Sequence, residues 1–380
     1  MNKAYKYRIY PNKQQAVLID KTIGCCRFLY NVMLSDKIDC YKATETMLYN
    51  TPAMYKGFYE FLKDIDSLAL ANIQLNLERA YKNFFTMPKT GFPKFKSKHK
   101  SSQKYTTNNL GQIYFEGGKI RLPKLGLVKV VKHRECQGEI KSVTVSKTKT
   151  GKYYVSVLCE YENQVEHKPI SSESKMVGLD YSSSNFFVSS DGEFADMPHY
   201  FRESEKQLVK EQRMLSLKQK RGKNYGKQKI KVAKVHEKIS NQRTDWLHKK
   251  SSELVKTYDC IFVEDINMKS ISRSLRLGKA TLDNAYGRFR EFLEYKSKEQ
   301  GKYLVKINKF CPTTKLCHIC GYKYQDITLS IKDWTCPDCK TWHHRDINAA
   351  INILQFGKEI INGGRDDRSS LAVFSRNYLE

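Results

Sequence analysis

Two cysteine pairs of equal spacing constrain the fold of this chain more than any other feature. Cys317 and Cys320 form one C-x2-C unit, and Cys336 and Cys339 form a second after an interval of fifteen residues. This spacing is typical of zinc ribbons, in which four thiolates hold one Zn²⁺ tetrahedrally. Because four thiolates leave no open coordination position, we expect a structural ion that folds residues 311–342 into a small ribbon.

The charge of the chain points to a polyanionic partner. Lysine and arginine number 67 against 40 aspartate and glutamate, which gives a formal net charge of +27 over 380 residues. Nucleic acid is the first candidate for such a partner. A membrane partner is not expected, because no apolar run approaches the roughly 18 residues of a spanning helix. The start of the chain lacks the apolar run of a signal peptide, which favours a cytoplasmic protein with reduced thiols.

The hydrophobic pattern predicts several domains. Short alternating runs separated by turn residues indicate β-structure, and longer amphipathic stretches indicate helices. A later region alternates between apolar strands and helices, as α/β domains do. Apart from the ribbon, we expect a β-barrel from residues 1–10 and 91–170, an inserted helical domain over 11–90, an α/β domain from 175–310 and 343–362, and a disordered tail over 363–380.

Three acidic residues occupy positions from which they could meet. Asp180 and Glu264 each follow a short apolar strand, and Asp346 begins a helix. The element order (three strands, a long helix, strand, helix, strand, helix) is typical of a ribonuclease H-like domain and puts Asp180 on the first strand and Glu264 on the fourth. Three such carboxylates can hold two Mg²⁺ ions roughly 3.5–4 Å apart for phosphodiester hydrolysis. Each acid alone could instead be a loop residue or, for Asp346, a helix cap.

Residues 202–250 are unusually basic, with sixteen lysine and arginine against five acidic residues. The pattern predicts a helical hairpin that turns near Gly222 and Gly226. On its second helix, Val232, Val235, Ile239 and Trp246 share one stripe and lysines share another. Such a cationic stripe can bind phosphates, although it can also be a merely solvated face. The candidate nucleic-acid contacts are Lys231, Lys234, Lys238 and Arg243.

These motifs together resemble those of the TnpB family of transposon-encoded RNA-guided DNA nucleases, which is related to compact type V CRISPR effectors. The resemblance extends over nearly the whole chain. One departure is Lys340, at a position that the family often fills with glycine. The strongest matches are VGLDYSSSNFFVSSDGE (177–193), FVEDIN (262–267), LEYKSKEQGKYLVKINKFCPTTKLCHICG (293–321) and WTCPDCKTWHHRDINAAINIL (334–354).

The resemblance implies a fold, cofactors and partners. It implies a RuvC nuclease domain with the ribbon inserted as a target-nucleic-acid-binding element, and a wedge-like β-barrel with a helical recognition domain. Asp180, Glu264 and Asp346 would hold two catalytic Mg²⁺ ions. A guide RNA would direct a monomeric protein to double-stranded DNA beside a short motif. The candidate contacts to that motif are Asn72, Asn76, Tyr105 and Thr106, of which Tyr105 is expected to stack on a base.

Three other functions remain open from the sequence. A nuclease-inactive guided binder could act as a repressor, although all three acids are present. A zinc-ribbon protein could bind nucleic acid without a guide or catalysis. A strand-joining transposase, or an accessory to one, is the third alternative, because the ribonuclease H-like fold also serves those enzymes.

Overall fold

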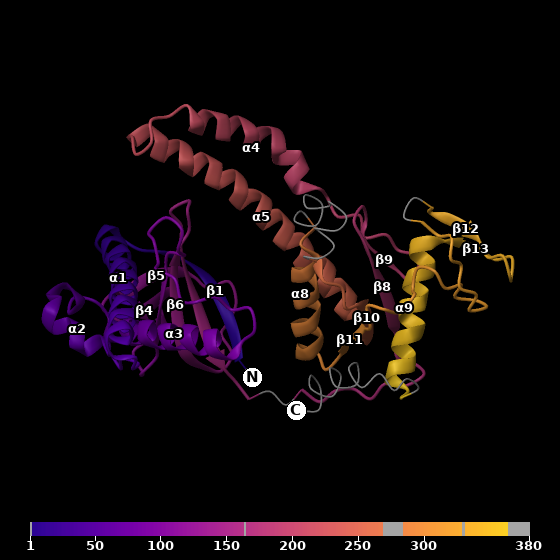
Figure 1. The fold of residues 1–380 in the computed structure, drawn as a ribbon, viewed down its shortest axis with the longest axis horizontal. Coiled ribbons are helices and arrows are strands. Elements are labelled where there is room, and N and C mark those ends of the chain that lie inside the picture. Colours follow the sequence, from indigo (N-terminus) through magenta and orange to yellow (C-terminus); the bar gives the residue numbers. More distant parts are fainter. Residues whose placement is uncertain (1, 163–164, 269–283, 329–330, 364–380) are drawn as a thin grey trace. The chain divides into compact units, whose positions relative to one another are not determined.

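The computed structural model describes residues 2–162, 165–268, 284–328 and 331–363. The chain divides into two compact units, Met1–Asn163 and Gln164–Glu380 (Figure 1). The expected tail, 363–380, lies outside the described residues except for Gly363. No helix within the described ranges combines the length and the apolar character needed to cross a membrane.

The first unit is built on one antiparallel sheet of seven strands. Strand β1 lies within the sheet and pairs with β7 and β5, so the first residues of the chain join strands that come much later, as the sequence predicted. The sheet curls but does not close, because the outermost strands β2 and β3 do not pair with each other. The expected β-barrel is therefore an open half-barrel. The strands, in the order β2-β6-β7-β1-β5-β4-β3, are Lys104–Asn108, Glu139–Lys147, Tyr153–Glu160, Asn2–Tyr10, Gly126–Val131, Lys119–Leu122 and Tyr114–Glu116.

The helices of this unit lie between β1 and β2 in the chain. The first begins at a capping box, in which the side chains of Asn12 and Gln15 each accept the other residue's backbone N–H. The third begins after Asp66, whose carboxylate accepts from the backbone N–H of Leu68. The helices are α1 (Lys13–Thr44), α2 (Pro52–Phe58), a short 3₁₀ turn η1 (Glu60–Leu62) and α3 (Ser67–Thr86).

The second unit contains a four-stranded mixed sheet in the order β11-β10-β8-β9. Strands β8 (Met176–Ser182), β10 (Cys260–Glu264) and β11 (Tyr303–Ile307) are parallel, and β9 (Phe186–Ser189) pairs antiparallel with β8. Among the described residues, the third strand expected before the long helices is reduced to one bridge, between Val188 and Phe194. Glu264 therefore ends the third strand of this sheet in chain order, not the fourth.

The boundary between the two units lies earlier than expected. The sequence assigned residues up to 170 to the barrel, but Lys168 belongs to the second unit. Its backbone N–H donates to the carbonyl of Gly301 at 3.3 Å, and its carbonyl accepts from the Tyr303 hydroxyl at 3.0 Å. Residues 162–175 are polar and have no hydrophobic periodicity, so only these long-range contacts show which unit Lys168 belongs to.

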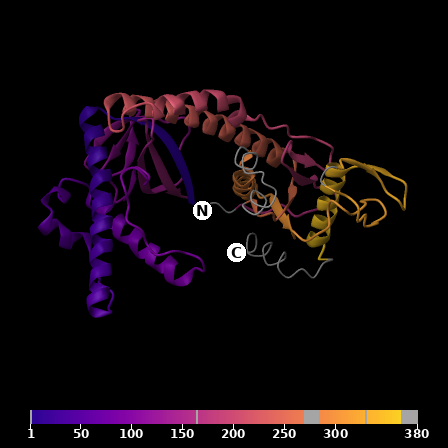
Figure 2. The same ribbon diagram turned by 45° about the horizontal axis from the view of Figure 1, so that its top comes forward.

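Two long helices of the second unit run side by side as a hairpin (Figures 1 and 2). These are α4 (Tyr200–Ser216) and α5 (Lys223–Thr257), so Gly226 lies inside α5 and the turn ends at Gly222. The predicted apolar stripe of α5 is confirmed. Val235 and Ile239 are buried against Leu208 of α4, and the Trp246 ring packs edge-on against Phe186.

Two further helices of this unit lie within the described residues, α8 (Tyr286–Glu299) and α9 (Arg345–Ile361). Helix α9 packs directly on the sheet because small residues let the backbones approach. A Cβ added to Gly178 of β8 would lie 2.2 Å from the carbonyl oxygen of Ala350, and one added to Gly357 would lie 1.9 Å from the ring of Phe262. The contact at Gly178 brings the start of α9 close to the middle of β8. A short hairpin of β12 (Asp333–Thr335) and β13 (Trp342–His344) precedes α9.

Candidate functional site

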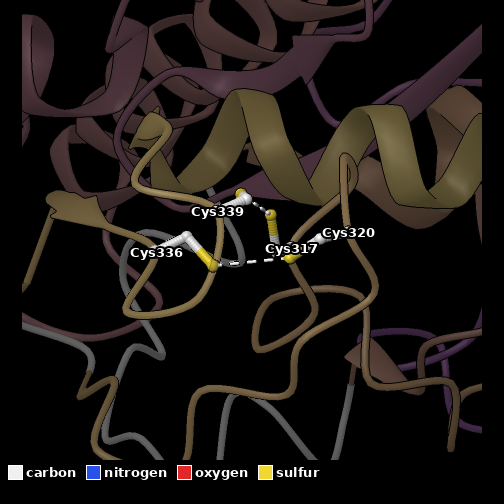
Figure 3. Close-up of side chains that lie close together, drawn as sticks. All are labelled: Cys317, Cys320, Cys336 and Cys339. Carbon is white, nitrogen blue, oxygen red and sulfur yellow. Dashed lines mark hydrogen bonds between the residues drawn. The ribbon is translucent and has the colours of Figure 1, made fainter.

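The four cysteines of the two C-x2-C units converge in one cluster, as predicted (Figure 3). The Sγ atoms of Cys317 and Cys339 are 3.6 Å apart, as are those of Cys320 and Cys336, and all four sulfur atoms lie within 4.8 Å of one another. A tetrahedron with Zn–S bonds of about 2.3 Å has edges of about 3.8 Å. The cluster is therefore consistent with one structural zinc ion.

The two cysteine pairs lie on two backbone turns of the same type. In the first, the N–H of Gly321 donates to the carbonyl of Cys317 at 3.0 Å; in the second, the N–H of Lys340 donates to the carbonyl of Cys336 at 3.0 Å. Gly321 has φ +75° and Lys340 has φ +62°. Glycine adopts this left-handed conformation at little cost, whereas a lysine there costs about 1–2 kcal/mol. The second turn is thus the strained one.

Replacing Lys340 with glycine should stabilise the ribbon. The free energy gained by removing the left-handed strain should exceed that lost with the exposed hydrogen bond from Lys340 Nζ to the Pro337 carbonyl. The expected net stabilisation is about 1 kcal/mol. We expect Lys340→Gly to slow zinc release to a chelator about fivefold. The matched control is Gly321→Ala, whose added Cβ meets no atom within 4 Å, so only its backbone conformation is penalised. Faster release from Lys340→Gly would contradict this account.

His343 lies beside the cluster but outside it. Its Nε2 atom is 3.1 Å from the sulfur of Cys317, and its side chain is buried against Trp334. Burial, and then the neighbouring His318, lower the pKa of His343, which favours the neutral ring. A neutral ring that carries its proton on Nε2 can donate to the thiolate and stabilise it. No sequence pattern distinguishes this histidine from its neighbours His318 and His344.

The three predicted acids come from three neighbouring elements. Val263 of β10 is in register with Leu179 of β8, so the next residues, Glu264 and Asp180, lie side by side on parallel strands and face the same side of the sheet. Asp346 is the second residue of α9, one helical turn before the Ala350 contact with β8. The fold therefore brings the predicted acids to one region of the second unit.

The electrostatics of these acids differ from one to the next. Burial, followed by the charges of Glu264 and Asp346, raises the pKa of Asp180 well above its ordinary value. Burial also raises the pKa of Glu264, against the lowering effect of a hydrogen bond from the Thr313 hydroxyl to Oε1 at 2.6 Å. Burial acts in the same direction on Asp346, but hydrogen bonds from Lys332 and Arg345 outweigh it and lower the pKa of Asp346. Ionisation of Asp180 and Glu264 is thus disfavoured, whereas the carboxylate of Asp346 is stabilised by its two cationic neighbours.

Two cations hold the carboxylate of Asp346. Lys332 Nζ lies 2.7 Å from Oδ2, while Nη2 and Nε of Arg345 lie 2.8 and 3.0 Å from Oδ1. Arg345 is also tied to the ribbon segment, because Nη1 donates to the carbonyls of Thr328 and Ile331. Sequence reasoning missed Thr313, Lys332 and Arg345. Of the three, only Arg345 had a signal in the sequence, which is its position next to Asp346.

The carboxylate oxygens are less tightly grouped than the thiolates. Within the part of the chain that the structure describes, the four cysteines are the one group of three or more potential metal ligands whose ligand atoms all lie within 4.8 Å of one another. The three acids do not meet that distance.

The candidate nucleic-acid residues of the first unit lie on or near one cleft of about 470 Å³. Asn76 and Thr106 line it with the cations Arg27, Lys96 and Lys104, while Asn72 lies one helical turn from Asn76 and is not part of the lining. The lining therefore combines these polar and cationic groups with apolar side chains such as Ile23 and Ile73.

Tyr105 corrects one expectation. It also borders this cleft, but its side chain is only 5% exposed and belongs to the hydrophobic core. A base could stack on the ring only by displacing core side chains, so the expected stacking is not supported. The alternation in β2 buries Tyr105 and Thr107 and turns Thr106 toward the cleft.

The candidate cations of the second unit lie along α5. Lys231, Lys234 and Lys238 are exposed on a stripe beside the one that holds the buried Val235 and Ile239, and Arg243 is half-buried. The helix thus has one packed face and one cationic face, as its sequence predicted.

Comparison with known proteins identifies the family. A Streptomyces pristinaespiralis protein named for RNA-guided DNA endonuclease activity is 32% identical to this chain over 369 residues, covering 94% of this chain and 90% of its own length. The chain belongs to the TnpB family. Another TnpB-family relative, InsQ of Escherichia coli K12, is named for the same activity and is 29% identical over 383 residues, covering 95% of this chain and 94% of its own.

Family models match three segments of this TnpB-family chain. They are described as "Probable transposase" (residues 156–275), "Cas12f1-like, TNB domain" (286–353) and "Helix-turn-helix domain" (1–46). The second match contains all four cysteines. The third differs from the structure, in which residues 1–46 hold strand β1 and the single helix α1.

A solved structure extends the likeness to the fold. The protein in a Cas12f1–sgRNA–target DNA complex superposes with a TM-score of 0.59 at 11% identity, covering 93% of this chain and 98% of that one. This TnpB-family chain therefore has a mixed α/β, Cas12f-like fold.

Proposed function

We propose that this chain is an RNA-guided DNA endonuclease that cleaves double-stranded DNA by cation-dependent hydrolysis in a RuvC-like, ribonuclease H-like domain. Asp180, Glu264 and Asp346 would be the cation ligands. The observation that carries the proposal is that the β8–β10 register and the packing of α9 on β8 bring the three acids together, close enough for Glu264 and Asp346 both to raise the pKa of Asp180. Acids held together against their mutual repulsion are typical of functional sites. The names of the two full-length relatives support the same activity.

The donor set fits Mg²⁺ or Mn²⁺, because both ions prefer oxygen ligands. Three such carboxylates are a donor set that could hold two ions of this kind. When bound, such ions would activate the attacking water and stabilise the leaving oxygen. The chain itself would hold Asp180 and Glu264 in register on adjacent strands and keep Asp346 oriented at the start of α9. Lys332 and Arg345 would offset the charge of Asp346 and hold its carboxylate in place.

We further propose that a guide RNA supplies sequence recognition by base pairing with one DNA strand. The cationic face of α5 would bind nucleic-acid phosphates through Lys231, Lys234, Lys238 and Arg243. The cleft lined by Asn76 and Thr106, with Asn72 nearby, would contact a short motif next to the target. The ribbon would bind target nucleic acid, and the protein would act as a monomer in the complex.

The test is cleavage by the full chain purified with its co-purifying RNA. A DNA target that matches the RNA guide should be cut in Mg²⁺ and left intact in EDTA, and an unmatched target should survive both. Binding of the matched target without cutting would favour the guided repressor. Binding that needs no RNA would favour a simple zinc-ribbon binder, and joined DNA products would favour a strand-joining transposase.

RNA binding should depend steeply on salt, and α5 should carry part of that dependence. Each phosphate contact contributes roughly 0.7–0.9 to the slope of log affinity against log salt. We expect the triple variant Lys231→Gln, Lys234→Gln, Lys238→Gln to reduce the slope by about two in filter binding between roughly 0.1 and 0.5 M salt. Lys249→Gln on the same helix is the control, because Lys249 already pairs with Asp245 at 2.7 Å. An unchanged slope in the triple variant would exclude α5 from the interface.

A further inference from the structure

Thr313 connects the proposed cation site to the segment that leads into the four-cysteine cluster. It follows β11, precedes Cys317 by four residues, and its side chain is only 3% exposed. Its hydroxyl donates to Glu264 Oε1 at 2.6 Å, a short bond of the kind that charged acceptors make. A half-buried carboxylate with one oxygen held by a buried donor cannot rotate freely, so its second oxygen is restricted in direction as well.

The backbone of Thr313 is anchored to the helix that carries Asp346. Its carbonyl accepts from Asn352 Nδ2 at 2.8 Å, and the same amide donates to the Leu316 carbonyl at 2.6 Å. Asn348, one turn earlier on α9, donates to the Leu316 carbonyl at 2.7 Å. Both asparagines are buried, with 0% and 1% exposure. Their only role in these contacts is to fix the path of residues 313–316, because each bond goes to backbone.

We propose that Thr313 is a positioning residue of the nuclease site, whose hydroxyl orients the Glu264 carboxylate relative to Asp346 of α9. The proposal rests on the function proposed above, because it treats Glu264 as a cation ligand. A donor that fixes a metal ligand from outside the coordination sphere typically contributes about 10- to 100-fold to metal affinity. The hydroxyl is the essential group, since the methyl group of threonine makes no bond to the acid. Serine should therefore replace threonine, and valine should not.

The test compares Thr313→Val, Thr313→Ser, Glu264→Gln and Asp180→Asn in the full-length, zinc-loaded chain freed of RNA by high-salt washing. Mn²⁺ binding is measured by electron paramagnetic resonance, and zinc content and melting temperature are measured alongside. We expect Thr313→Val to bind Mn²⁺ about tenfold more weakly at unchanged zinc content, and Thr313→Ser to stay within about threefold of the wild type. In the RNA complex, Thr313→Val should shift the Mg²⁺ concentration for half-maximal cleavage more than the maximal rate.

The acid variants separate failure of this proposal from failure of the proposed function. If Glu264→Gln and Asp180→Asn weaken Mn²⁺ binding but Thr313→Val does not, Thr313 has no positioning role. If neither acid variant changes Mn²⁺ binding, the cation site itself is wrong. If Thr313→Val loses zinc, Thr313→Ala takes its place as the hydroxyl-free variant, and equal Mn²⁺ binding by Thr313→Ala and Thr313→Ser would overturn the proposal.

Discussion

Asp180→Asn should abolish DNA cleavage by the RNA-loaded chain, lowering the rate by about a thousandfold or more while leaving RNA loading and target binding within about twofold. Asp180 is the acid that interacts with both of the others, so its loss removes charge from the centre of the proposed cation site. Single-turnover cleavage of a matched target measures the rate, and gel-shift titration of the same target measures binding. Retained cleavage would remove Asp180 from the mechanism and with it the proposed cation site.

Asp180→Asn should not destabilise the folded protein. The pKa of Asp180 is raised in the folded protein, so the unfolded chain releases the proton more readily and ionisation of Asp180 opposes folding. This cost is present above the folded-state pKa and disappears below the unfolded one. Asparagine cannot ionise, so without divalent cations Asp180→Asn should melt at or above the wild-type temperature. A marked fall in melting temperature would show that lost cleavage reflects unfolding.

Asp265→Asn is the matched control for these measurements. Asp265 directly follows Glu264, but its side chain is 66% exposed and lies 3.5 Å from Arg290. Surface ion pairs of this kind contribute about 0–1 kcal/mol. We therefore expect cleavage and melting close to the wild type. Loss of cleavage in Asp265→Asn with retention in Asp180→Asn would mean that the wrong acids were assigned.

Local pattern was sufficient to predict the elements that carry the acids. The strands that end near Asp180 and Glu264 are apolar runs bounded by polar residues, and the helix after Asp346 has clear periodicity. Burial in a parallel sheet produces such runs, because both faces are covered. The cysteine pairs were equally informative, since metal ligation fixes their spacing.

Long-range contacts could not be predicted in the same way. Tyr105 lies among polar residues and looks exposed in the sequence, but the pairing of β2 with β6 sets which of its faces is buried. A shift of one residue in that register would reverse the outcome. Lys332 and Thr313 reach Asp346 and Glu264 from 14 and 49 residues away in the chain, and no local pattern reveals these long-range partners.

Loss of one cysteine should affect the acids as well as the metal. Cys317→Ser removes one of four thiolates, and structural zinc binding is worth about 10–16 kcal/mol of folding energy in small zinc domains. We expect zinc to fall well below one ion per chain. The ribbon segment supplies Lys332 to Asp346 and the carbonyl of Ile331 to Arg345, so those contacts should loosen with it. RNA loading should change less, because the candidate cations on α5 lie outside the ribbon.

The measurements are zinc content by metal analysis, RNA affinity, and cleavage of a matched target. Cleavage should fall about 100-fold or more, since ligands displaced by even an ångström lose most of their effect. Cys311→Ser is the control, because Cys311 lies six residues before the cluster and contributes no ligand to it. Zinc and cleavage both retained in Cys317→Ser would refute the four-thiolate site. Loss of zinc with cleavage intact would agree with the four-thiolate site. It would show, however, that the acids act independently of the ribbon, because the contacts from the Thr313 and Lys332 segments would then be dispensable for catalysis.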